Sequence, residues 1–148
     1  MRHTHPALFL SQQEKEKIVA AIRAAEKETS GEIRVHLAAI AAGDILQQAK
    51  NIFEKIGMTA TKERSGVLIF LCIESRQFAI LGDTGIHAKV PENFWEEISQ
   101  KMAAHFKQGH FATGMIEAIL EAGEKLKTHF PHQTNDQNEL SDRISYSN

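Results

Sequence analysis

The amino-acid sequence predicts an α/β domain, a three-layer α/β/α sandwich with a small mixed β-sheet and helices on both faces. Two observations lead to this prediction. Residues 66–73 form an unbroken apolar run, which is typical of a central strand covered on both faces. Segments with helical spacing of apolar residues lie before and after this run. The order α, β, α, β, β, α, α has too few strands for a β-sandwich and only one hairpin, so the sheet must be mixed.

The first half of the chain supplies a helix, a strand and a second helix. A capping box that starts at Ser11 precedes a helix expected over about residues 12–29. Residues 32–38 then alternate between apolar and polar side chains, which is the period of a strand. Helical spacing returns over about residues 44–57, where a glycine supplies the stop.

The second half supplies a hairpin and two helices. The apolar run turns at residues 74–77 and returns as an antiparallel strand over residues 78–81. A helix is expected from Pro91 to Gly109, since proline fits the first helical turn and glycine ends a helix. The last helix is expected over about residues 111–129.

Length and composition suggest one domain with a tail. The 148 residues are 42% hydrophobic and 24% charged, an ordinary balance for a globular domain with a real core. We expect residues 1–130 to form that domain. From residue 131 to residue 148 the sequence is polar and aperiodic, which predicts a mobile C-terminal tail in which residues 138–140 could dock back.

Charge and apolar content argue against several classes of protein. The 17 basic and 19 acidic residues give a formal charge of −2, which leaves no basic field for nucleic acid. No stretch approaches the roughly 20 apolar residues needed to span a bilayer, and the N-terminus has no signal-peptide core. The single cysteine, Cys72, cannot form an internal disulfide. We therefore expect a cytoplasmic protein with no membrane role.

The segment that most suggests chemistry is Gly82–Val90, predicted as a loop directly after the hairpin. Its glycines, Gly82 and Gly85, allow a positive φ and a close approach of the backbone to a ligand. Asp83 follows the carboxyl end of a strand, where open α/β sheets bind ligands, so it is the first candidate for a metal ligand or catalytic acid. Alternatively, it caps the loop by accepting backbone N–H bonds. His87 could transfer protons, bind metal or be a hydrogen-bonded loop residue.

Four further residues could complete this site. Glu32 and Asp44 are candidate metal ligands at the start of a strand and of a helix. Asp44 also fits an N-cap, and Glu32 could simply remain solvated. Arg64 and Arg76 flank the hairpin and could hold a phosphate bidentately, or be ordinary surface arginines.

Other catalytic motifs are missing. Cys72 lies within a strand and has Phe78 six positions on, which excludes a cysteine-based phosphatase loop. Gly85 stands where an aspartyl-phosphate mechanism needs its second acid, so hydrolysis would require metal-activated water. Six of the histidines have neither a cysteine partner nor the paired spacing of a metalloprotease, which argues against zinc: His3, His5, His105, His110, His129 and His132.

A series of motifs carries a family resemblance. They are Gly57-Met58-Thr59-Ala60-Thr61, Arg64-x-Gly66-Val67-Leu68-Ile69, Arg76-x-Phe78-Ala79-Ile80-x-Gly82-Asp83-x-Gly85-Ile86-His87-Ala88, Phe94-Trp95, His105-Phe106-x-x-Gly109-x-Phe111-Ala112-x-Gly114 and Asp136-x-Asn138-Glu139-Leu140-x-Asp142. Together they resemble the short bacterial branch of the TPM domain family, over roughly residues 8–142. That family includes the thylakoid-lumen repair proteins and many bacterial membrane-anchored proteins.

The resemblance implies an α/β/α fold and, for some relatives, a divalent cation site and a weak acid phosphatase activity. This chain departs from the family pattern at two positions. His5 and Ser65 stand near the places where metal-binding relatives carry an aspartate and an acid or asparagine. Part of a calcium shell would then be missing, and the transmembrane segment and glycine-rich tail of many relatives have no counterpart in this sequence.

Three functional hypotheses follow. The first is a non-enzymatic or vestigially catalytic binding module that engages a protein partner or a divalent cation, weakly bound Ca²⁺ or Mg²⁺, through the Gly82–Val90 segment. The alternative is a weak metal-dependent phosphatase acting on phosphomonoesters, with Asp83 as a ligand and His87 as proton shuttle. A third possibility is a homodimer, because Gly114 and Gly123 inside the last helix permit close helix approach.

Overall fold

The computed structural model of the protein describes residues 2, 4–41, 43–133 and 144–147. Its helices are α1 (Pro6–Phe9), α2 (Gln12–Glu26), α3 (Ile45–Lys55), α4 (Thr84–Lys89), α5 (Glu96–Lys107) and α6 (Phe111–Leu126). Its strands are β1 (Glu32–Ala38), β2 (Gly66–Cys72), β3 (Gln77–Gly82) and β4 (Ser145–Ser147). Within these described residues, no helix is long and apolar enough to cross a membrane.

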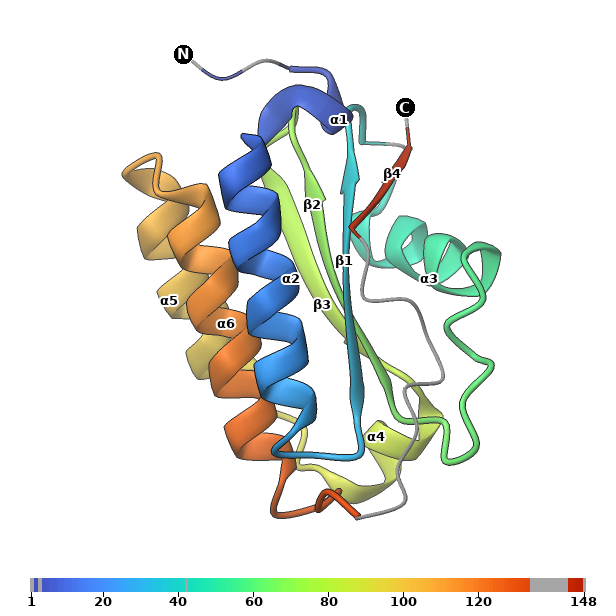
Figure 1. Ribbon diagram of the computed structural model, residues 1–148. Coiled ribbons are helices and arrows are strands. Elements are labelled where there is room, and N and C mark those ends of the chain that lie inside the picture. Colours follow the sequence, from blue (N-terminus) through green and yellow to red (C-terminus); the bar gives the residue numbers. More distant parts are fainter. Residues whose placement is uncertain (1, 3, 42, 134–143, 148) are drawn as a thin grey trace.

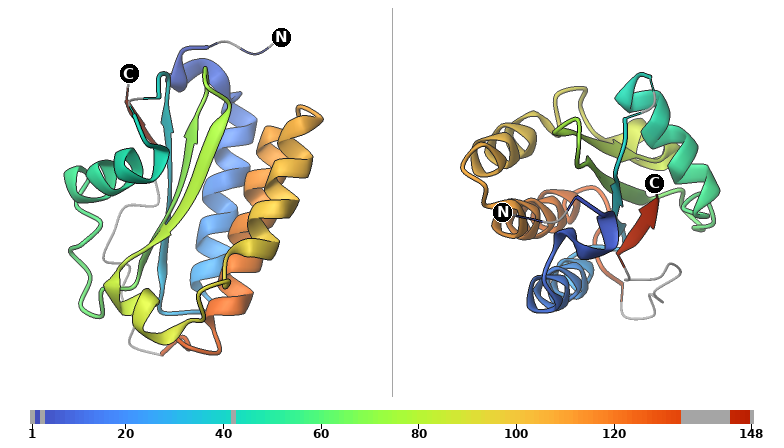
Figure 2. Two further views of the ribbon diagram at one scale, coloured as in Figure 1. Left: turned by 180° about the vertical axis from the view of Figure 1, so that it is seen from behind. Right: turned by 90° about the horizontal axis from the view of Figure 1, so that it is seen from above.

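The elements form the predicted three layers. Helices α2, α5 and α6 lie on one face of the sheet and α3 lies on the other (Figures 1 and 2). Because side chains alternate along a strand, the sheet contributes to two cores. Ile33, Val35 and Leu37 of β1 pack with the three-helix layer, whereas Leu68 and Phe70 of β2 pack with α3. The predicted fold class is therefore confirmed.

The sheet is mixed, in the order β3-β2-β1-β4. β1 pairs in parallel with β2, with Glu32 opposite Gly66, and β3 returns antiparallel, with Gly82 opposite Val67. The starts of β1 and β2 therefore share one end of the sheet with the end of β3. We call this end the amino edge, and the opposite end, where β1 and β2 finish, the carboxyl edge. α4 lies at the amino edge, at the bottom of Figure 1.

The fourth strand was not predicted. Ser145–Ser147 add to β1 in parallel, opposite His36–Ala38, although the whole segment from residue 131 was expected to be a polar tail. Only three residues of β4 pair, and their partners in β1 lie more than a hundred positions away in the sequence, so no local sequence pattern indicates this strand. The predicted docking of residues 138–140 lies outside the described residues.

Several element boundaries also differ from the prediction. The expected loop over Gly82–Val90 contains α4, which Asp83 begins by accepting a hydrogen bond from the Thr84 amide. The following helix does not begin at Pro91: residues 92–95 form turns, and α5 starts only at Glu96. Pro91 is compatible with the end of α4 at Lys89, because proline cannot donate the backbone hydrogen bond that would continue the helix.

The two glycines of α6 are used inside the chain. A Cβ at Gly123 would lie 2.7 Å from the Cβ of Ala25 on α2, and one at Gly114 would lie 2.9 Å from Cε1 of Phe106 on α5. Both glycines are buried in α6. The inference that they permit close helix contact is confirmed, but the contacts are intrachain, so these positions do not supply the expected homodimer surface.

Candidate functional site

The centre of the candidate site is a bidentate ion pair at the amino edge. Asp83 follows β3 directly, and its side chain is only 4% exposed. Arg64, just before β2, donates from Nε to Oδ2 at 2.7 Å and from Nη2 to Oδ1 at 2.9 Å. The Thr84 amide donates to Oδ1 at 2.7 Å. Both carboxylate oxygens therefore accept charge-assisted or capping hydrogen bonds.

Arg64 is held in an unusual backbone conformation. Its φ is 53°, in the left-handed region that non-glycine residues rarely occupy. Its carbonyl oxygen accepts a hydrogen bond from the Gly85 amide at 3.0 Å. A Cβ at Gly85 would collide with the carbonyl oxygens of Glu63 and Arg64. Gly85 is therefore required for the approach of α4 to the chain's own backbone.

The predicted reason for the two loop glycines was thus wrong. The glycines with positive φ among the described residues are Gly43, Gly57 and Gly109, not Gly82 or Gly85. A Cβ at Gly82 would lie 2.8 Å from Cγ2 of Ile86 on α4. Both glycines of this segment serve the packing of α4, and the close approach that they allow is intrachain.

The structure separates the six predicted site residues into two groups. Glu32 begins β1 at the amino edge, where it is buried, and His87 is exposed on α4 at the same edge. Asp44 lies at the carboxyl edge, where it caps α3 by accepting a hydrogen bond from the Gln47 amide at 3.3 Å. Arg76 lies in the β2–β3 turn at that same far edge. A six-residue strand separates the two ends by about 20 Å, so Asp44 and Arg76 cannot act with Asp83.

The expectation that Asp83 occupies the ligand-binding end of the sheet is also wrong. Asp83 does follow the carboxyl end of its own strand. However, β3 is antiparallel, so this position coincides with the amino ends of the parallel strands β1 and β2. Ligands of open α/β sheets bind outside the carboxyl ends of the parallel strands.

The two positions that depart from the family pattern have structural roles here. His5 caps α1, since its Nδ1 accepts a hydrogen bond from the Ala7 amide at 3.2 Å. Ser65 is buried; its amide donates to Thr61 Oγ1 at 3.0 Å, and its carbonyl accepts from the Glu32 amide at 3.1 Å. Both residues therefore organise the backbone in this structure.

A histidine that sequence reasoning did not single out is buried at the carboxyl edge. His36 Nδ1 lies 2.7 Å from Ser145 Oγ, and its Nε2 lies 2.8 Å from Ser147 Oγ. Burial, followed by the charges of Arg34 and Lys55, lowers the pKa of His36 to about 4. The imidazole is thus neutral at pH 7 and a weak base, which suits a structural clamp on β4 better than proton transfer.

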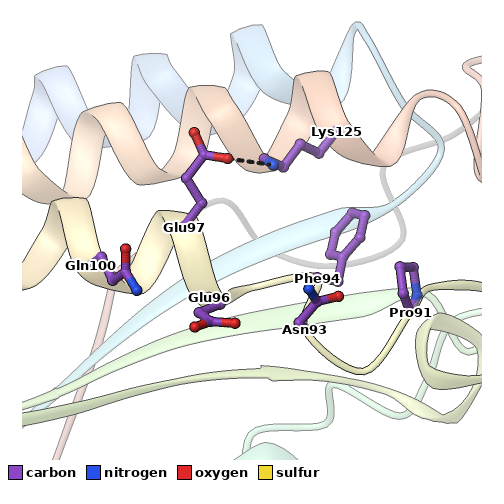
Figure 3. Close-up of a pocket in the computed structure, with 7 residues that line it drawn as sticks. All are labelled: Pro91, Asn93, Phe94, Glu96, Glu97, Gln100 and Lys125. Carbon is purple, nitrogen blue, oxygen red and sulfur yellow. Dashed lines mark hydrogen bonds and ion pairs between the residues drawn. The ribbon is translucent and has the colours of Figure 1, made fainter.

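A hollow of about 370 Å³ lies beside the helical layer (Figure 3), and the residues that line it include none of the predicted site residues. It is lined by the turn before α5, by the first turns of α5 and by Lys125 of α6. Hydrogen bonds from Lys101 and Lys125 hold the pKa of Glu97 below its usual range. Lys125 Nζ lies 3.3 Å from Glu97 Oε2, so one of the two acids that line this hollow is already ion-paired.

Comparisons with known proteins agree on one family. The model of the TPM domain matches residues 4–125. The solution structure of the BA42 protein from Bizionia argentinensis is 41% identical, covers 93% of this chain and 95% of that one, and has a TM-score of 0.89. No match was found among curated proteins.

Two more distant structures share the fold. The N-terminal domain of a protein from P. gingivalis is 22% identical, with a TM-score of 0.68, and the alignment covers 85% of this chain and 83% of that one. The N-terminal domain of the cg2496 protein from Corynebacterium glutamicum is 15% identical, with a TM-score of 0.63 and coverage of 91% and 79%. At these identities the likeness concerns the fold alone.

Proposed function

The chain belongs to the TPM domain family, and we propose that this member is a non-catalytic binding domain that engages a protein partner through the surface around α4. This surface, called the α4 surface below, consists of the exposed side chains of Lys62, Glu63, Arg64, Thr84, His87 and Lys89. The observation that supports the proposal is the Arg64–Asp83 ion pair. In this pair Asp83, the first candidate for a metal ligand or catalytic acid, is bound to Arg64 and stabilises the α4 surface.

A rigid frame supports binding by this surface. The ion pair, the Asp83 cap and the Gly85–Arg64 backbone hydrogen bond tie α4 to the segment before β2. Within α4, the side chain of Ile86 is fully buried and anchors the helix, whereas Thr84 and His87 are exposed. A backbone that is already fixed loses little further conformational freedom on binding, which favours recognition of a partner.

The same geometry disfavours cation binding and hydrolysis. A cation at Asp83 would compete with the Arg64 guanidinium for the same two oxygens and would sit beside its positive charge. Phosphate capture by Arg64 and Arg76 together would require two groups at opposite ends of the sheet. His87 could shuttle protons only to a water held by Asp83, whose oxygens are covered. Cation binding is therefore left out of this proposal, and the second experiment below tests it directly.

The partner hypothesis is tested with one charge change at each end of the sheet. His87→Glu alters the α4 surface, and Gln47→Glu makes a matched change on an exposed residue of α3 at the carboxyl edge. Each immobilised variant is cross-linked in extract of the native host, and retained proteins are quantified. The expected result is a protein retained by the parent and by Gln47→Glu but lost by His87→Glu. Equal retention by both variants would overturn the proposal.

A second experiment tests the enzyme and cation alternatives. Asp83→Asn is compared with Asp44→Asn, a cap at the other edge, in aryl phosphate hydrolysis and in backbone NMR titrations with Ca²⁺ and Mg²⁺. We expect no hydrolysis that depends on Asp83 and no shift around residues 82–87 at millimolar cation. Loss of hydrolysis in folded Asp83→Asn alone, or saturable shifts centred on residue 83, would contradict the proposal.

A further inference from the structure

Besides the amino and carboxyl edges, the sheet has two sides that run along its outer strands, and the chain protects these two sides differently. On the β1 side, the Glu26 carboxylate accepts the Ile33 amide at 3.0 Å, and β4 covers residues 36–38. Ser145 Oγ also donates to the Val35 carbonyl at 3.4 Å. Side-chain caps and a very short outer strand are devices that protect a sheet edge from pairing with another chain.

The β3 side has no such device among the described residues. β3 is the outermost strand on that side, is six residues long, and contains neither a charge nor a proline. The Asp83 amide donates to the Gly66 carbonyl at 2.9 Å, which fixes the phase of the β2–β3 ladder. Because antiparallel partners alternate, Ala79 and Leu81 turn their backbone groups toward β2, and Phe78, Ile80 and Gly82 turn theirs outward.

These outward groups form no hydrogen bond to any described residue. The flanking strand β2 is fully buried, whereas Phe78, Ile80 and Leu81 of β3 are half-buried. β3 therefore presents an open row of donors and acceptors along a partly exposed apolar strand. Such an edge is a template for strand addition.

We infer that β3 is the interface for a second copy of this chain, which adds its own β3 antiparallel about a two-fold axis at Ile80. In this register Ile80 lies opposite its own equivalent, and Phe78 lies opposite Gly82 of the second copy. All three outward residues then meet outward residues, which gives about six backbone hydrogen bonds.

The chemistry of the strand favours a second copy as the occupant. Two-fold pairing of a charged strand brings like charges together, and β3 carries no charge. The pairing also places an aromatic ring beside a glycine, which the ring can cover. The assembly closes at two copies, because the outer edges of the resulting eight-stranded sheet are the protected β4 sides.

The first test uses the unmodified chain. Light scattering after gel filtration, over about 10 μM to about 1 mM, is expected to show the mass rising from 16.6 kDa toward twice that value. Amide exchange followed by NMR should slow about tenfold or more at Phe78, Ile80 and Gly82 over the same range. The inward amides of Ala79 and Leu81 are the internal control, since they pair with β2 at every concentration.

Two proline variants make the second test. Ile80→Pro removes an outward amide and leaves the ladder to β2 without a lost bond. Tyr146→Pro is the matched control, because Tyr146 lies between the inward-facing residues of β4 and turns its own amide away from β1. Ile80→Pro should remain monomeric and Tyr146→Pro should dimerise like the parent.

Several results would overturn the inference. They are a constant mass of 16.6 kDa to about 1 mM, a dimer whose β3 amides exchange as in the monomer, and dimerisation of Ile80→Pro. Protection of the outward amides without a change in mass would also overturn it, since the cover would then come from the same chain. If Ile80→Pro does not fold, exchange in the unmodified chain still decides.

Discussion

Replacing Asp83 by asparagine should measure what the ion pair at the amino edge contributes to stability. Asparagine keeps the shape of the side chain and its ability to cap α4, but it loses the charge that attracts Arg64. Hydrogen bonds to a charged group contribute about 1.5–3 kcal/mol, and the Arg64 side chain, 46% exposed, is rehydrated when its partner is neutral. The free energy of unfolding should therefore fall by about 2 kcal/mol.

Calorimetry and urea denaturation give this quantity directly. For a domain of this size, about 2 kcal/mol corresponds to a fall in Tm of about 6–8 °C. High salt should reduce the difference between Asp83→Asn and the parent only partly, because the carboxylate is buried and poorly screened. A loss below about 0.5 kcal/mol would refute the view that the pair fixes α4.

Arg64 provides the complementary test. Arg64→Ala leaves a buried carboxylate without its cation and should destabilise more than Asp83→Asn, where the remaining partner is half-exposed. Arg64→Gly loses the same ion pair, but glycine adopts the left-handed backbone conformation at φ 53° without strain. The glycine variant should therefore be more stable than the alanine variant. Equal Tm values for the two would contradict the backbone argument.

Four further changes test the Arg2–Glu14 ion pair, the buried His36 and the packing of α6. Hydrogen bonds from Arg2 lower the pKa of Glu14 to about 2. The ion pair therefore stabilises the fold above pH 4.5, and its contribution to the free energy of unfolding is lost as the pH falls toward 2. Glu14→Gln should flatten the pH dependence of stability between these two values. The pKa of His36 is lowered to about 4, so its neutral form stabilises the fold above pH 6.5. This contribution to the free energy of unfolding, about 3 kcal/mol, is lost on acidification toward pH 4. His36→Gln should flatten the pH dependence of stability between these two values in urea titrations. Gly123→Ala meets the backbone of α2 and should cost about 1–3 kcal/mol by calorimetry, more than Gly114→Ala, whose nearest neighbour is a ring edge that can move.

The layers and the parallel core could be read from the sequence because they depend on local periodicity. The apolar run of β2 predicted a strand buried on both faces, and every residue of β2 is buried. The capping box at Ser11 is present with both of its hydrogen bonds. These features depend on residues within a few positions of one another, so one sequence is enough to specify them.

The missing features depend on residues that are distant in sequence. β4 is held by the contacts of its serines with His36, 109 and 111 positions away. α4 is held by a backbone contact at Gly85, but in the sequence this glycine resembles a loop residue. The periodicity of Phe94 and Trp95 extended the predicted α5 back to Pro91, although these aromatics lie in turns and pack against each other, with centroids 4.7 Å apart. Helical spacing alone cannot distinguish a helix turn from such a packed turn.

The candidate site shows why strand direction matters more than residue type for a functional prediction. Asp83 after a strand suggested a ligand, and the same residue in a parallel strand would have lain at the carboxyl edge with Asp44. The hairpin reverses β3 and brings Asp83 beside Arg64 instead, because both flank the paired ends of β2 and β3. Arg64 therefore constrains the chemistry of Asp83, because its guanidinium, 2.7 Å away, already occupies the carboxylate. A small neutral residue at position 64 would leave a buried carboxylate that only a proton or a cation could neutralise.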